Sequence, residues 1–139
     1  MARTLAEWHR VLRAGGLLMI AVPDLAALAR MYLDTSLGLE THWLVTRMMY
    51  GGQTDEYDYH LIGFDETMLT MFLSNAGFCE IERVGNFNIG IQDASSQVTE
   101  GYAISLNMVA RPCLSKTKGS AGGFKISHQA SPFDPNVYK

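Results

Sequence analysis

The spacing of apolar residues changes several times along the first half of the chain, and each change predicts a different element. Apolar side chains recur every three or four residues over residues 5–12, which predicts a helix with Thr4 as its N-terminal cap. Residues 17–22 are apolar at every position, as in strands that are covered on both faces of a sheet. Helical spacing returns in residues 25–33 and 39–50, so two further helices are expected there, and Asp24 can cap the first of them.

The second half of the chain predicts one more helix and two more strands. Asp65 is placed to cap a helix that continues to Asn75. Residues 79–84 alternate apolar and charged side chains, which indicates a half-exposed strand, and residues 102–110 form the last expected strand after a long loop, 85–101. This order of helices and strands predicts an α/β layer protein.

The charged residues divide the chain into an acidic body and a basic tail. Residues 1–114 carry seven Arg and thirteen acidic side chains, whereas residues 115–139 carry four Lys and one Asp. Residues 115–139 are rich in Ser, Gly, Lys and Pro and have no periodicity, so we expect an extended tail after one domain. The formal net charge of −3 gives no general indication of nucleic-acid binding.

The two cysteines, Cys79 and Cys113, make no disulfide framework, and neither belongs to a CxxC pair. We interpret both as free thiols, which predicts a reducing compartment, cytoplasmic or organellar, and not a secreted protein. The longest apolar run, from Leu17 to Pro23, is too short to span a bilayer, so no transmembrane segment is expected.

One stretch of the chain resembles class I S-adenosylmethionine (SAM)-dependent methyltransferases. Residues 5–24 read LAEWHRVLRAGGLLMIAVPD, which is similar to the helix, Gly-Gly turn and fifth strand of that family, with Arg13-Ala14 where Lys-Pro is usual. Shorter motifs, also in order, resemble predicted SAM-dependent methyltransferases of the type-11 kind; they lie at residues 47–53, 58–60, 63–66, 73–78, 93–96 and 104–107. The resemblance covers about residues 4–111.

The resemblance implies the C-terminal half of a Rossmann-like methyltransferase sheet. In that family the strand order is 3-2-1-4-5-7-6, with strand 7 antiparallel. Residues 17–22 would be strand 5, residues 79–84 strand 6 and residues 102–110 strand 7, which leaves a 5-7-6 sheet with flanking helices. The family's SAM-binding elements belong to strands 1–3 and would precede Met1. The resemblance therefore implies that this chain alone binds no cofactor, although SAM is the cofactor of the family.

The expected partial sheet leaves one edge of strand 17–22 without a partner. An exposed apolar edge strand invites association, so we expect a protein partner that covers this edge. The function that follows is a methyltransferase-like subunit or scaffold of a larger protein assembly, inactive by itself. The alternative is the acceptor-side half of an active methyltransferase that another polypeptide completes. The tail, with Lys116, Lys118 and Lys125, is expected to dock on an acidic or mixed protein surface, the alternative being a solvated tail.

The loop after residue 50 holds the first group of candidate site residues. His60, with Asp58 nearby, is a candidate for proton transfer or for orienting a substrate. Arg47, Tyr50 and Gln53 flank a Gly-Gly pair and could bind a polar or acidic substrate. The alternatives are a histidine that only holds the turn, and an arginine paired with one of the acids at 55 and 56.

Asp93 and Ser95, in the long loop before the last strand, are further candidates for substrate binding. The alternative for them is a turn-capping role, which such residues commonly have. Gly15-Gly16 and Gly51-Gly52 are interpreted as turns and not as cofactor loops, since neither opens a helix after a strand. No pair of histidines or acids has metal-ligand spacing on one helix face, so no metal site is expected.

Overall fold

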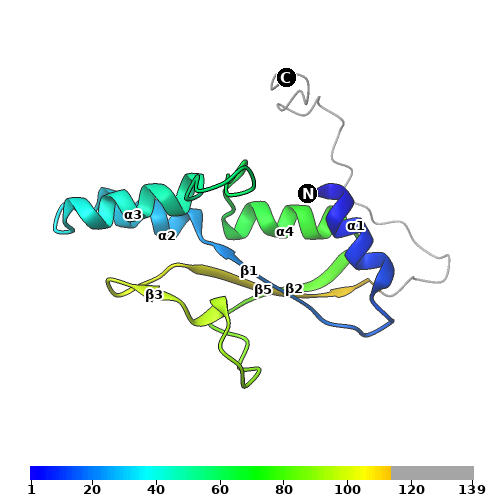
Figure 1. The fold of residues 1–139 in the computed structure, drawn as a ribbon. Helices are drawn as coiled ribbons and strands as arrows, with labels where there is room; N and C mark the ends of the chain where they lie inside the picture. Colours follow the sequence, from blue (N-terminus) through cyan, green and yellow to red (C-terminus); the bar gives the residue numbers. More distant parts are fainter. Residues whose placement is uncertain (114–139) are drawn as a thin grey trace.

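Helices and strands alternate through the chain as the apolar pattern indicates (Figure 1). The structure is a computed structural model that describes residues 1–113; the predicted tail, 115–139, lies outside the described residues. The elements are α1 (Ala2–Val11), β1 (Leu18–Pro23), α2 (Leu25–Leu33), α3 (Leu39–Tyr50), α4 (Glu66–Asn75), β2 (Phe78–Val84), η1 (Ala94–Ser96), β3 (Val98–Thr99), β4 (Tyr102–Ala103) and β5 (Ser105–Pro112).

The main sheet has three strands in the order β1-β5-β2, and the central strand β5 is antiparallel to both neighbours. The register along β1 runs from Leu18 opposite Ala110 to Pro23 opposite Ser105. The expected last strand, 102–110, is interrupted at Ile104. The N–H of Ile104 donates to the carbonyl of Gln97, whereas the carbonyl of Ile104 accepts from the N–H of Asp24. The short strand β4 therefore pairs with β3 in a separate two-stranded sheet. The predicted α/β class is confirmed.

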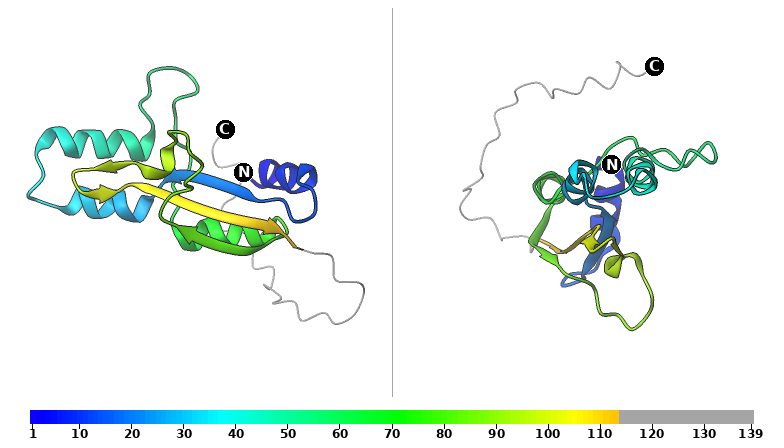
Figure 2. Two further views of the ribbon diagram at one scale, coloured as in Figure 1. Left: turned by 90° about the horizontal axis from the view of Figure 1, so that it is seen from below. Right: turned by 90° about the vertical axis from the view of Figure 1, so that its left-hand side faces the viewer.

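The helices lie on one side of the three-stranded sheet, and the segment 85–101 lies on the other side (Figure 2). The main core forms between α1, α4 and the sheet face that carries Ile20, Leu106 and Met108. These three side chains share a face because successive residues of a strand point to opposite sides. A second, smaller core joins α2 and α3 through Leu28, Met31, Val45 and Ile104.

Two of the predicted helix starts are confirmed, and one is wrong. Asp24 accepts hydrogen bonds from the N–H groups of Ala26 and Ala27 at the start of α2, and Asp65 accepts one from Met68 in α4. Thr4 does not cap α1, because that helix already begins at Ala2 and Thr4 lies inside it.

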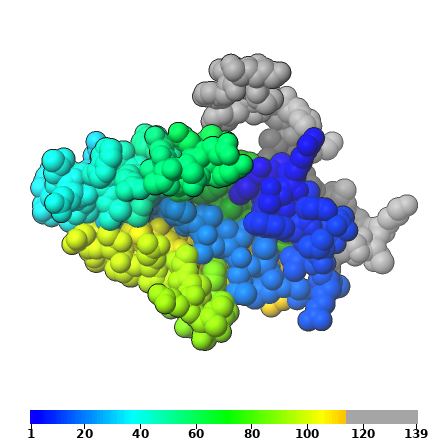
Figure 3. Space-filling model, in the orientation of Figure 1, coloured from blue at the N-terminus to red at the C-terminus, as the bar shows by residue number. Residues whose placement is uncertain are grey.

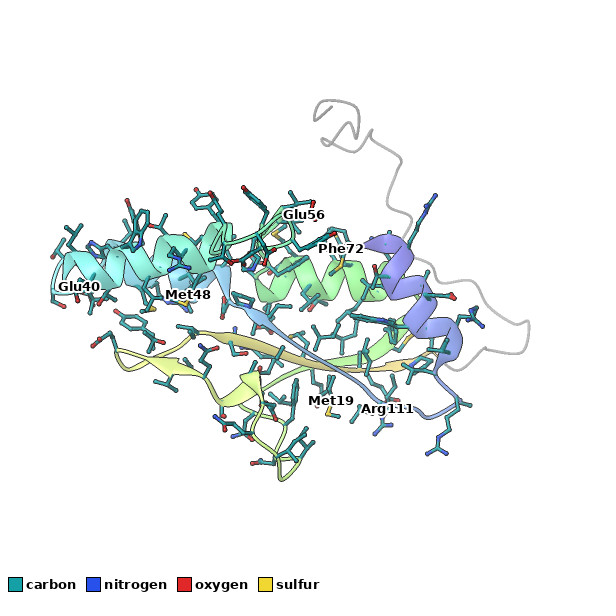
Figure 4. The ribbon with its side chains drawn as sticks, viewed as in Figure 1. Met19, Glu40, Met48, Glu56, Phe72 and Arg111 are labelled. Atoms are coloured by element: carbon teal, nitrogen blue, oxygen red, sulfur yellow. A yellow bond between two sulfur atoms is a disulfide. The ribbon has the colours of Figure 1, made fainter. Side chains whose placement is uncertain are left out.

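The expectation that β1 is covered on both faces is also wrong for the described residues. Ile20 is buried under the helices, but Met19, on the opposite face, is 41% exposed. Met19 points away from the helix layer (Figure 4). Within residues 1–113, the helices therefore cover the apolar side chains on one face of β1 but not those on the other face.

The prediction of free thiols is wrong, because Cys79 and Cys113 form a disulfide. The pairing of β2 with β5 places Phe78 opposite Pro112, and the N–H of Cys113 donates to the carbonyl of Gly77. This register brings the two cysteines, which are 34 residues apart in the sequence, to a Cα–Cα distance of 4.9 Å. The reducing compartment was predicted from free thiols, which the structure does not contain at residues 79 and 113. The compartment therefore stays a prediction.

Candidate functional site

Two adjoining cavities open at the carboxyl end of β1, where its last residues meet the end of α3. Their volumes are about 180 and 220 Å³, and both are lined by Val22, Pro23, Met48 and His60. Met48 reaches from α3 toward the sheet (Figure 4). Apolar clefts that contain a few polar groups are the usual binding sites for small molecules, so this cleft is the foremost candidate site.

His60 is fixed at this cleft by two hydrogen bonds to the last turn of α3. The backbone N–H of His60 donates to the carbonyl of Tyr50 at 3.1 Å, and the ring Nδ1 of His60 lies 2.9 Å from the carbonyl oxygen of Met48. A helix leaves its last carbonyls without partners, so these bonds stabilise the end of α3. His60 thus holds the turn, as the alternative interpretation states, while it also lines the cleft.

Asp58 and His60 do not form a proton relay, because each is engaged elsewhere. The carboxylate of Asp58 accepts from the hydroxyl of Thr54 at 2.8 Å and from the N–H of Thr54 at 3.3 Å. The Thr54 hydroxyl is the main cause that lowers the pKa of Asp58, followed by the N–H groups of Thr54 and Gly52 and by the charge of Arg47. Asp58 is therefore an anion that organises residues 51–58.

Gly51 follows the last residue of α3, and the Gly51-Gly52 pair packs closely against Asp58. Gly51 has a φ of +86°, and a Cβ added to it would overlap the carbonyl oxygen of Asp58. A Cβ at Gly52 would lie 2.5 Å from Oδ2 of Asp58 and 2.8 Å from Nη2 of Arg47. Only glycine fits at Gly51 without strain, because other residues rarely take this conformation.

Arg47, Tyr50 and Gln53 come together, as predicted, around a shallow hollow of about 140 Å³. Within residues 1–113, Arg47 forms no ion pair with either neighbouring acid, Asp55 or Glu56. This hollow shares no lining residue with the two cavities at His60. The structure therefore separates the predicted arginine group from the predicted histidine.

Asp93 and Ser95 shape the loop between β2 and β3. Asp93 accepts from the N–H of Ser95 at 2.6 Å, and the Ser95 hydroxyl is the main cause that lowers the pKa of Asp93, followed by this N–H. The Ser95 hydroxyl accepts from the N–H of Phe87 at 3.0 Å, while the side chain of Asn107 donates to the carbonyls of Gly85 and Ser95. Asp93 caps the short helix η1 and Ser95 lies inside this helix, and both also line a hollow of about 180 Å³.

Asp24 is a buried charged residue for which the sequence predicted only a cap. Its carboxylate is fully buried and accepts from Nη2 of Arg83 at 2.7 Å, and Arg83 also reaches Glu66 at 3.3 Å. Local sequence patterns do not predict this pair, because 59 residues separate Asp24 from Arg83. The ion pair ties the end of β1 to the third strand of the sheet, β2.

A different surface feature lies along the other end of β1. Trp8, Val11, Leu12, Leu18 and Met19 line an open hollow of about 300 Å³, which we call the α1–β1 groove. The side of β1 is exposed between α1 and the segment 85–101 (Figure 3). Large exposed apolar patches on a protein commonly mark interaction sites.

Within residues 1–113 no group of three or more His, Cys, Asp or Glu side chains is arranged to hold a metal ion. No helix in the same part of the chain is long and apolar enough to cross a bilayer. Comparisons with protein-family models, with curated proteins and with solved structures find no match to this chain.

Proposed function

We propose that residues 1–113 correspond to strands 5, 7 and 6 of a methyltransferase-like sheet, and that the chain acts as a subunit or scaffold of a protein assembly without catalysing methyl transfer alone. The strand order β1-β5-β2 and the antiparallel direction of β5 support this correspondence. The motif resemblance over residues 4–111 supports it independently of the topology. The observation that carries the assembly role is the edge of β1 that has no strand partner within residues 1–113.

The register identifies which backbone groups of β1 are unpaired. The N–H of Asp24 donates to Ile104, so in the antiparallel pattern the N–H groups of Val22 and Ile20 also face β5. The N–H and carbonyl groups of Met19 and Ala21 then point to the free edge. Among the described residues, this edge is covered just at its end, where the N–H of Leu25 donates to the carbonyl of Phe64.

The surroundings of this edge fit an added strand from a protein partner. The α1–β1 groove provides apolar surface beside the free N–H and carbonyl groups, since Val11 is 63% exposed and Trp8 40% exposed. Strand addition satisfies the backbone groups, and burial of apolar side chains on each face adds affinity. Each large apolar side chain that is fully buried contributes about 1.5–3 kcal/mol.

A proline at residue 21 tests the edge directly. Ala21→Pro removes an N–H that faces the free edge but no bond of the β1–β5 ladder, and proline is tolerated on edge strands. The matched control is Ala21→Thr, which keeps the N–H and favours a strand. Tagged full-length chains are produced in their native cells, and the size of the complex that contains each is measured by gel filtration.

Wild type and Ala21→Thr are expected to elute in a complex larger than the single chain, and Ala21→Pro is expected to elute as the free chain. A complex of unchanged size with Ala21→Pro, in a chain whose circular dichroism is native, rejects the edge as the interface. Elution of the wild type as a free chain rejects the assembly role itself.

The cleft at His60 favours a second function, the acceptor-side half of an active methyltransferase. This cleft lies at the carboxyl end of the strand proposed as strand 5, where a substrate could be held next to a cofactor bound by a partner. Calorimetric titration with SAM separates the two functions. Binding only by the purified complex favours the second function, no binding by chain or complex favours the first, and tight binding by the chain alone rejects both.

A further inference from the structure

The cavity at the start of α2 has an almost entirely apolar wall. Its lining is contributed by β1, α2, α3 and the segment before α4, and consists of Val22, Pro23, Leu25, Leu28, Met48, Met49, His60, Ile62, Gly63 and Phe64. Leu28 is 1% exposed and Phe64 9% exposed, so the base of the cavity is part of the folded core. His60 carries the one ionisable side chain in this lining, and it lies at the exposed rim.

The size of the cavity limits its ligand to one ring. Its volume is about 180 Å³. An apolar cavity of about 150 Å³ in another protein stays dry and binds benzene. The cavity can therefore take a six-membered ring with one small substituent, and a fused pair of rings would have to extend into the neighbouring cavity of about 220 Å³.

The hydrogen bond between Nδ1 of His60 and the carbonyl of Met48 determines whether the other ring nitrogen, Nε2, donates or accepts. A carbonyl oxygen only accepts hydrogen bonds, so the Nδ1 that faces Met48 must carry the proton. In the neutral ring Nε2 is then an acceptor, and within residues 1–113 it has no hydrogen-bond partner. This nitrogen can accept from a hydroxyl on a ring that occupies the cavity.

We propose that this cavity binds a single-ring apolar molecule that carries one hydroxyl group, with the ring between Leu28, Met49 and Phe64 and the hydroxyl donating to Nε2 of His60. The site requires neither SAM nor a partner strand on β1, so its test is independent of the test of the assembly role. Phenol is the probe that matches the site, and anisole is its control because methylation removes the donor.

The test is a titration of the purified full chain with each probe, followed by NMR of the methionine methyl groups and the His60 ring protons. Phenol is expected to shift the signals of Met48, Met49 and His60 and to bind about five-fold more tightly than anisole, as one neutral hydrogen bond would give. Equal affinities for the two probes would overturn the role of His60. The absence of any shift at these methionines would overturn the site.

Two variants separate the hydrogen bond from the cavity. His60→Asn keeps a donor for the Met48 carbonyl but has no group in place of Nε2, so the preference for phenol should disappear while anisole binding remains. Ile62→Trp fills the cavity from a half-exposed loop position, so both probes should lose affinity at least ten-fold. Retained phenol preference in His60→Asn, or unchanged binding in Ile62→Trp, contradicts the proposal.

Discussion

At the scale of single residues, Asp24 combines more roles than any other side chain in the described chain. It caps α2, it is fully buried, and it accepts from Arg83 across the sheet. A buried carboxylate is stable only when its oxygens have partners, and here Oδ1 bonds the helix N-terminus while Oδ2 bonds the guanidinium. Asp24 thus joins the end of β1, the start of α2 and the outer strand β2.

Substitution of Asp24 should separate these roles. Asp24→Asn keeps an oxygen for the cap but loses the charge that attracts Arg83, whereas Asp24→Ala loses both. We expect the free energy of unfolding to fall by about 1 kcal/mol for Asp24→Asn and by about 2–3 kcal/mol for Asp24→Ala. Urea unfolding measures both values. No loss for Asp24→Asn would mean that the ion pair with Arg83, whose side chain is 38% exposed, contributes nothing. Equal losses for the two variants would mean that the cap contributes nothing.

At the scale of elements, the end of the sheet is secured by covalent and ionic links between β2 and β5. The Cys79–Cys113 disulfide joins the start of β2 to the residue after β5, and Arg111 pairs with Glu80 on the same strands. Glu80 has a φ of +48°, and the register of the two strands shifts between Cys79 and Glu82. A bulge of this kind bends a strand, so the links hold together a part of the ladder that is locally disrupted.

Reduction of the disulfide is expected to destabilise the chain by about 3 kcal/mol, since the bond closes a loop of 34 residues in the unfolded state. Urea unfolding with and without a thiol reductant measures the difference. The double variant with Ser at residues 79 and 113 should unfold at the same urea concentration in both conditions. A thiol titration of the untreated protein that finds two free thiols would contradict the bond.

At the scale of the whole molecule, the distribution of apolar surface is uneven. The helices cover one face of the sheet (Figure 1), while one edge of β1, next to the α1–β1 groove, has no strand partner within residues 1–113. Unpaired strand edges with apolar neighbours tend to associate, and proteins prevent this with charges or with a covering segment. Glu7 and Arg10 form an ion pair on the surface of α1, but the groove itself is lined only by apolar residues.

The isolated chain should therefore associate with itself as its concentration rises. We expect its sedimentation coefficient to increase with concentration, and we expect Met19→Lys to abolish the increase by placing a charge beside the free edge. Tyr57→Lys is the control, because Tyr57 is 85% exposed in a loop away from β1. If the control has the same effect as Met19→Lys, the association depends on general surface hydrophobicity and not on the edge.

The candidate site was only partly predictable from the sequence. The loop after α3 was identified, and Arg47, Tyr50 and Gln53 do lie together. Asp58 and His60 are close in the sequence but do not act as a pair, because Asp58 accepts from Thr54 and the His60 ring bonds the carbonyl of Met48. The apolar wall of the cleft was missed, because its residues come from four separate segments that look like ordinary core positions in the sequence.

The amino-acid sequence by itself determined the features that depend on neighbours along the chain. Apolar spacing predicted the helix at residues 39–50 with its observed bounds, and Asp24 and Asp65 were identified as caps. These features are local because helix hydrogen bonds and caps join residues no more than four apart. Only the tertiary structure decided the disulfide and the Asp24–Arg83 pair. Each of these depends on which strands become neighbours and in which register, and that choice is made by burial over the whole sheet.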